Sequence, residues 1–156
     1  MQVIQIQCRM LSGLSFALTF PRSKFNLVQY ADIAGSMKNC LNYFENFVIK
    51  KTQRKILIIG EMLELGASAL HYHEEIVFLI LKSSVDKIIF CGDYYKKILR
   101  GINFNSERIY CFADDLEIST FLEKFTLKND IILAKGSNST KVSKLVKKLL
   151  DTQGEK

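Results

Sequence analysis

From residue 35 onwards, the hydrophobic positions of the chain follow two patterns in turn. Apolar residues three or four positions apart are typical of amphipathic helices, which we expect after Ser36 and at residues 70–82, 94–99, 116–125 and 139–150. Short continuous apolar runs, typical of strands covered on both faces, lie between them at residues 55–59, 87–91, 108–112 and 130–134. This alternation predicts an α/β fold with three layers, in which a mostly parallel sheet carries helices on both faces.

The first 33 residues lack this regularity. Ile4, Ile6 and Cys8 alternate with polar residues and indicate one strand, followed by irregular chain. The apolar stretch after it has the outline of a signal peptide but no clear small-residue cleavage site. We therefore expect an atypical N-terminal segment, residues 1–33, and one α/β domain, residues 34–152, in a cytoplasmic protein.

The composition is that of a globular domain. The chain has 156 residues, of which 48% are hydrophobic and 24% charged. No apolar run reaches the roughly 20 residues that a membrane-spanning helix needs. The net charge is +6, and no aromatic residues interleave with the lysines on the solvated face of the last expected helix, Lys141, Lys144, Lys147 and Lys148. We therefore expect neither a nucleic acid nor a membrane as a partner.

The four cysteines form no metal-binding or disulfide pattern. None is part of a CxxC pair, and no histidine lies at a zinc-like spacing from two of them. Cys91 and Cys111 lie inside apolar runs, so we expect both to be buried. A reduced protein without a metal site is the expectation.

Candidate chemistry gathers where the expected strands end, because ligands of open α/β sheets bind beyond the carboxyl ends of the strands. Lys135, Gly136, Ser137 and Asn138 follow the fourth strand and lead into a helix. Free N–H groups at a helix N-terminus, a glycine and a lysine together favour an anion. The alternative is an ordinary capping run with a solvated lysine.

The loop after the first of these strands, residues 60–66, has two carboxylates between two glycines. Glu61 and Glu64 suit the orientation of an amine or a cation, although an exposed turn is the simpler interpretation. His73 follows on the next helix, where a histidine at the edge of an apolar face is more often structural than catalytic. Asp93, Asp114 and Asp115 follow two other strands and are expected to cap helices.

Several of these strings resemble one family. Residues 60–66, reading GEMLELG, with His73 after them, resemble the GDMxELG…H signature in the C-terminal, Rossmann-like domain of the Mur ligases that add D-alanyl-D-alanine. Residues 135–137 resemble the late KGS motif of that domain, and residues 36–38 resemble the start of its first helix.

The resemblance implies a role in peptidoglycan synthesis in the bacterial cytoplasm. The family activates a carboxylate of the UDP-MurNAc-tripeptide as an acyl phosphate with ATP and Mg²⁺, and the amine of D-alanyl-D-alanine then attacks it. The C-terminal domain closes over a central ATPase domain and helps to place the dipeptide and the nucleotide. On this basis the substrate-binding residues are Lys135, Gly136, Ser137, Asn138, Glu61, Glu64 and His73.

The chain also departs from the family. Of the family's DDSYNANP-like stretch before the first helix, only Tyr30 is kept in place, so Tyr30 and Ser36 are the two nucleotide-facing candidates. The KGSR of the family reads KGSN here, which replaces a guanidinium by the amide of Asn138. Neither a GxxxxGK[ST] nor a GxGxxG string occurs in the chain.

We therefore expect a truncated C-terminal domain that binds no cofactor of its own and is inactive alone. A central ATPase domain of a Mur ligase, supplied in trans, would be its partner, with D-alanyl-D-alanine or a similar dipeptide as ligand. The alternative is a small α/β binding module for an anionic ligand or for a carboxylate of a partner protein.

Overall fold

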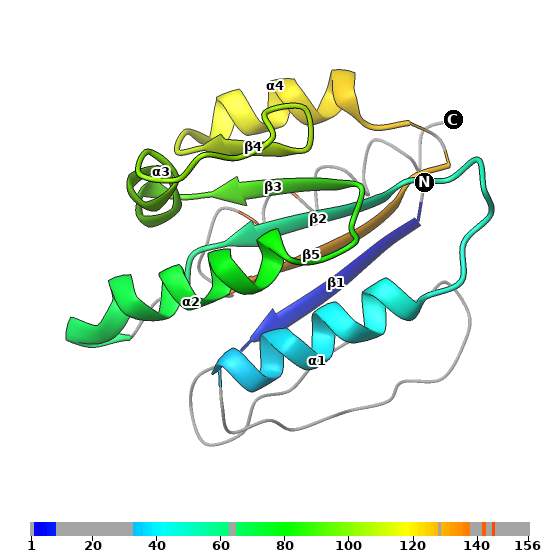
Figure 1. The fold of residues 1–156 in the computed structure, drawn as a ribbon. Helices are drawn as coiled ribbons and strands as arrows, with labels where there is room; N and C mark the ends of the chain where they lie inside the picture. Colours follow the sequence, from blue (N-terminus) through cyan, green and yellow to red (C-terminus); the bar gives the residue numbers. More distant parts are fainter. Residues whose placement is uncertain are drawn as a thin grey trace.

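The computed structural model describes residues 2–8, 33–62, 65–127, 129–137, 142 and 145, and for residues 2–8, 33–36, 115 and 137 it describes the backbone alone. All structural statements below concern this part of the chain. Within it, one parallel sheet forms the centre of the molecule (Figure 1). Its strands, in spatial order, are β1 (Gln2–Cys8), β5 (Ile131–Ser137), β2 (Lys55–Gly60), β3 (Lys87–Cys91) and β4 (Ile109–Phe112).

Helices cover both faces of this sheet, as the sequence predicts (Figure 1). One face packs against α1 (Ile33–Asn46), α2 (Ala69–Leu81) and α3 (Asp93–Leu99). The other packs against α4 (Asp115–Phe125) and the helical residues Val142 and Leu145. The expected three-layer α/β fold is confirmed.

Strand β2 shows why continuous apolar runs belong in such a sheet. Ile56 and Ile58 face the α4 side, and Leu57 and Ile59 face the α1 and α2 side, all four fully buried. Burial of each such side chain contributes about 1.5–3 kcal/mol to folding. A strand that is apolar at every position is therefore stable only between two layers of helices.

The strand expected near the N-terminus is present and extends the sheet beyond the four strands expected after residue 35. β1 pairs in parallel with β5 from Gln2↔Ile131 to Cys8↔Ser137. This pairing also corrects the expected end of β5, which continues past its apolar run because β1 and β2 flank it on both sides. Residues 135–137 consequently lie in the strand, and the expectation of a loop there was wrong.

Two further expectations need correction. Helix α1 begins at Ile33, so Ser36, after which this helix was expected, lies in its first turn. Cys111 is only partly buried, whereas Cys91 is buried, because β4 is an edge strand with a neighbour on one side only. Of the helix expected at residues 139–150, only Val142 and Leu145 are described, and its lysines lie outside the described residues.

Candidate functional site

The carboxyl ends of β5, β2, β3 and β4 meet along one edge of the sheet. In the register of the sheet, Ile59 of β2 stands beside Lys135 of β5, and Gly60 stands beside Cys91 of β3. The GEMLELG and KGS strings therefore start from neighbouring parallel strands. We call this edge the carboxyl rim and define it as residues 60–62, 92–95 and 135–137.

Lys135 is buried within this edge. Its side chain is 2% exposed and, by alternation along β5, it lies on the same face as Ile131 and Leu133, toward α1. Burial raises the pKa of the Cys40 thiol on α1 to about 12, and the positive charge of Lys135 acts in the opposite direction. Lys135 lies in β5 and not in the expected loop, and its burial contradicts the alternative of a solvated lysine.

Glu61 reaches across to the start of α3. Its Oε1 accepts a hydrogen bond of 2.7 Å from the backbone N–H of Tyr94. α3 has Gly92 as its N-cap, with no capping side chain of its own, so the carboxylate supplies the acceptor that a cap normally provides. A negative charge at this end of a helix is also electrostatically favoured.

Gly92 leaves the space that Glu61 occupies. A Cβ on this glycine would lie 2.2 Å from the Glu61 Cδ, and the φ of Gly92 is +142°. Both the space and the backbone conformation therefore require glycine here. The close approach explains how a side chain from the loop after β2 reaches the backbone after β3.

His73 is fully buried beneath the loop after β2, and both of its ring nitrogens are engaged. Nε2 accepts a hydrogen bond of 3.1 Å from the Met62 N–H, and Nδ1 lies 2.6 Å from the carbonyl oxygen of Ala69. This network assigns a neutral imidazole with its proton on Nδ1. The ring stacks on Tyr94 at 4.8 Å and meets Tyr95 edge-on at 5.0 Å. The geometry agrees with the structural interpretation of this histidine.

Tyr95 adds a third link between these two loops. Its hydroxyl donates a hydrogen bond of 3.4 Å to the carbonyl oxygen of Gly60. Burial raises the pKa of Tyr95 well above its usual value, with further contributions from Cys91 and Glu61. The phenol therefore stays neutral and acts as a hydrogen-bond donor.

The remaining candidates are placed only in part. Glu64, Asn138 and Tyr30 lie outside the described residues, and Ser36 and Ser137 are described by their backbone alone. Asp114 caps α4 as expected, since its Oδ1 accepts from the N–H groups of Leu116 at 2.8 Å and of Glu117 at 3.1 Å. Asp93 and Asp115 are the first residues of their helices and not N-caps.

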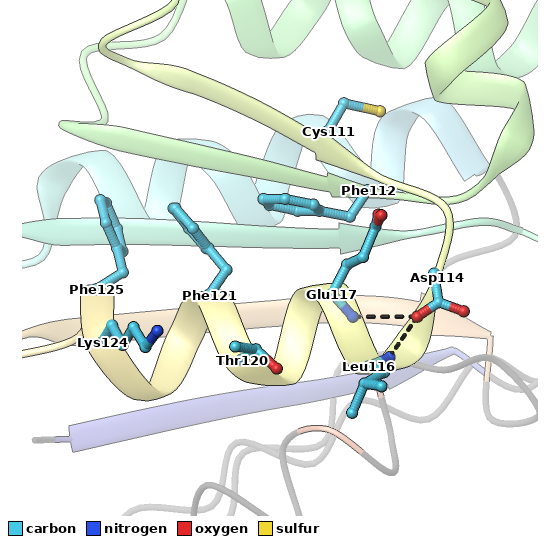
Figure 2. A pocket seen from close by; sticks show the side chains of 9 residues that line it. All are labelled: Cys111, Phe112, Asp114, Leu116, Glu117, Thr120, Phe121, Lys124 and Phe125. Atoms are coloured by element: carbon cyan, nitrogen blue, oxygen red, sulfur yellow. Dashed lines mark hydrogen bonds between the residues drawn. The ribbon is translucent and has the colours of Figure 1, made fainter.

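A groove between α4 and β4, which the sequence did not predict, has a volume of about 890 Å³ (Figure 2). The rings of Phe112, Phe121 and Phe125 form its apolar wall, and Glu117 and Lys124 lie along the helix. The aromatic spacing of α4 is a sequence signal of this groove, and the structure adds Leu116, which is exposed. Of the residues expected to bind a substrate, those within the described part of the chain do not line this groove.

The described residues do not form a metal site. Among them, no group of three or more His, Cys, Asp or Glu side chains could hold a metal ion. The carboxylates of Glu61 and Asp114 are engaged on backbone N–H groups at helix starts. These carboxylates are not arranged to bind Mg²⁺, so we assign no metal-dependent step to them. No helix in the same part of the chain is long and apolar enough to span a bilayer.

Relatives of known activity match most of the chain. A ligase of Rickettsia prowazekii, UDP-N-acetylmuramoyl-tripeptide–D-alanyl-D-alanine ligase, is 31% identical over 151 residues, which is 92% of this chain and 32% of the relative. The enzyme of the same name from Buchnera aphidicola is 34% identical over 104 residues, 65% of this chain and 22% of the relative. The chain thus spans about a third or less of the length of these relatives.

Solved structures show the same fold. MurF from Acinetobacter baumannii superposes with a TM-score of 0.63 at 21% identity, over 78% of this chain and 27% of that structure. MurF from Thermotoga maritima, solved with ADP, gives a TM-score of 0.55 at 20% identity, over 80% of this chain and 28% of that structure. The family described as "Mur ligase, glutamate ligase domain" matches residues 22–138. The chain therefore belongs to this family and is a C-terminal domain of the Mur ligase type.

Proposed function

We propose that this chain acts as the C-terminal domain of an ATP-dependent ligase that joins D-alanyl-D-alanine to the UDP-MurNAc-tripeptide in the cytoplasm. The names of the relatives support this reaction. The observation that carries the proposal is the register of Ile59 beside Lys135, because it joins the two strings that resemble the family at one edge of the sheet.

In this reaction the carboxyl rim holds the amine of the dipeptide in position to attack the acyl phosphate. An amine attacks an acyl phosphate efficiently only when the two are held in contact and in the right orientation. Gly136 allows a ligand to approach the backbone closely, and Lys135 contributes positive charge at the same strand end. Ser137, Asn138 and Glu64 belong to the proposed dipeptide site.

Four other residues, in the rim or outside it, have supporting tasks in this proposal. Glu61 and His73 shape the loop after β2, and Tyr30 and Ser36 face the nucleotide. ATP and Mg²⁺ supply the activation of the carboxylate and are bound by a central ATPase domain, since the 156 residues contain no P-loop string. That domain is the proposed protein partner.

A fusion enzyme tests the proposal. The C-terminal domain of the Rickettsia ligase is replaced by this chain, and the fusion is incubated with ATP, Mg²⁺, UDP-MurNAc-tripeptide and D-alanyl-D-alanine. We expect phosphate release together with the ligated product, detected by mass spectrometry. The chain alone and the Rickettsia ligase without its C-terminal domain should give neither.

The alternative of a binding module is distinguished in the same experiment. Calorimetric titration of the chain with D-alanyl-D-alanine and with inorganic phosphate measures binding without catalysis. A folded fusion that forms no product, together with a chain that binds phosphate and not the dipeptide, contradicts the ligase proposal and favours the binding module.

A further inference from the structure

The loop after β2 and the loop after β3 are held together by contacts among side chains, of which those of His73 and Tyr95 are fully buried. His73 lies at the centre of this group, beneath Met62, with Tyr94 and Tyr95 against its ring. Glu61 joins the same two loops through the Tyr94 N–H. The two loops therefore form one unit, and His73 contacts both of them from a fully buried position, as Tyr95 does.

In the hydrogen bond between Met62 and His73, the Met62 N–H is the donor and the imidazole ring is the acceptor. Nδ1 of His73 is used on Ala69, four residues earlier in the same helix, which fixes the ring relative to α2. Nε2 is then the only ring atom left to accept a hydrogen bond, and the Met62 N–H provides the donor. A buried amide that lost this acceptor would be costly to leave unpaired.

The position of Met62 affects the neighbouring strand end. Residues 60–62 continue directly from Ile59, which stands beside Lys135 in the sheet. A change in the course of the chain at Met62 therefore alters the edge at which Ile59 and Lys135 lie side by side. His73 acts on this edge without any exposed surface of its own.

We infer that His73 is a positioning residue of the carboxyl rim, which holds the loop after β2 through the acceptor Nε2 and does not contact a substrate. The hydrogen bond and its effect on the loop are properties of this chain alone. The effect on ligation rests on the proposed function, and the two are tested separately.

Two substitutions each keep one of the two hydrogen bonds of the His73 ring and remove the other. In His73→Gln, the side-chain amide reaches the position of Nε2 and can accept from Met62, but it gives up the contact with Ala69. In His73→Asn, the amide reaches only the position of Nδ1, so it keeps Ala69 and loses Met62. Both variants remove the ring stacking on Tyr94, which makes them a matched pair.

Amide hydrogen exchange of the full chain, measured by NMR, gives the direct result. We expect the Met62 N–H to exchange about tenfold faster in His73→Asn than in His73→Gln, because one hydrogen bond is lost. Amides of the β2 core, such as that of Leu57, should change equally in the two variants. His71→Asn, at an exposed position of the same helix, should leave the Met62 exchange unchanged. Equal exchange of Met62 in the two His73 variants would overturn the inference.

If a variant does not fold, the inference is tested on the unsubstituted chain instead. The ¹⁵N shifts of the His73 ring at neutral pH should show a protonated Nδ1 and an unprotonated Nε2. A proton on Nε2 at neutral pH overturns the inference as firmly as equal exchange does.

The fusion enzyme then gives the functional result. We expect His73→Asn to raise the KM for D-alanyl-D-alanine several-fold over that of His73→Gln, with the KM for ATP equal in the two. Equal dipeptide KM values in active fusions would show that the loop does not serve the dipeptide. An inactive fusion refutes the proposed function and leaves the exchange result as the test of the positioning role.

Discussion

The carboxylate of Glu61 accepts a hydrogen bond from the backbone N–H of Tyr94, so a residue that follows β2 closes the start of the helix that follows β3. The two residues are 33 positions apart in sequence. Adjacent strand ends in this domain are consequently coupled to each other and not independent loops on a common sheet.

Replacing Glu61 tests this closure. Glu61→Ala removes the acceptor at the start of α3 and should lower the free energy of unfolding by about 1 kcal/mol, as loss of an N-cap does. Glu61→Gln keeps an acceptor oxygen and loses only the charge, so its effect should be about half as large. Urea unfolding of the chain measures both, and equal losses in the two variants would show that the hydrogen bond to Tyr94 is not the stabilising contact.

Gly92 should not tolerate a side chain. Gly92→Ala places a Cβ 2.2 Å from the Glu61 side chain at a φ of +142°, and we expect a loss of about 2 kcal/mol or more. Gly101→Ala is the matched control, since its Cβ would lie 3.6 Å from the nearest atom, the carbonyl oxygen of Ile98. Thermal unfolding should separate the two variants clearly, and a similar melting temperature for both would contradict the close approach at Gly92.

The ion pair between Arg54 and Asp130 stabilises the end of the domain opposite the rim. Arg54 donates from Nε to Oδ1 at 2.9 Å and from Nη2 to Oδ2 at 2.7 Å, and Asp130 is buried. Arg54→Met leaves this carboxylate without its partner and should cost about 2 kcal/mol or more in urea unfolding. Lys51→Met, at an exposed position nearby, is the control and should change stability by less than about 0.5 kcal/mol. If both substitutions changed the free energy of unfolding equally, the ion pair would not be stabilising.

Alkaline pH should destabilise the chain through Cys40. Burial raises the pKa of this thiol from 9.0 to about 12, so the folded chain holds a proton that the unfolded chain releases. The contribution of Cys40 is therefore complete below pH 9 and is lost progressively as the pH rises toward 12. Urea unfolding at several pH values should show a smaller alkaline loss for Cys40→Ala than for the unsubstituted chain. Identical pH profiles would mean that the thiol ionises as easily in the folded chain as in the unfolded one.

Much of the fold follows from the local pattern of the sequence. The run at residues 87–91 coincides with β3, and helix spacing locates α2 and α4 within one residue at each end, because these segments are apolar on the faces that pack. The length of β5 could not be predicted in this way. Residues 135–137 carry no strand pattern and extend the strand through pairing with β1, which comes from the other end of the chain.

The candidate site was predictable in its location and not in its internal contacts. The carboxyl ends of parallel strands lie at one edge of the sheet, so Gly60 and Lys135 could be expected at the same edge. The partner of Glu61 could not, since Tyr94 lies in a different βα unit and no local pattern joins the two. The burial of Lys135 was missed as well, because it depends on the strand continuing to this residue and on the helix layer that covers this face of β5.

The central claim is that the strand ends of β2 and β5 together serve the incoming dipeptide. The most direct measurement is the KM for D-alanyl-D-alanine of the fusion enzyme and of its Lys135→Met variant, which removes the charge and keeps a similar volume. We predict that this KM rises about tenfold, because the positive charge beside the strand end is lost, while the KM for ATP stays close to that of the parent. An unchanged dipeptide KM in a folded, active Lys135→Met fusion would contradict the claim.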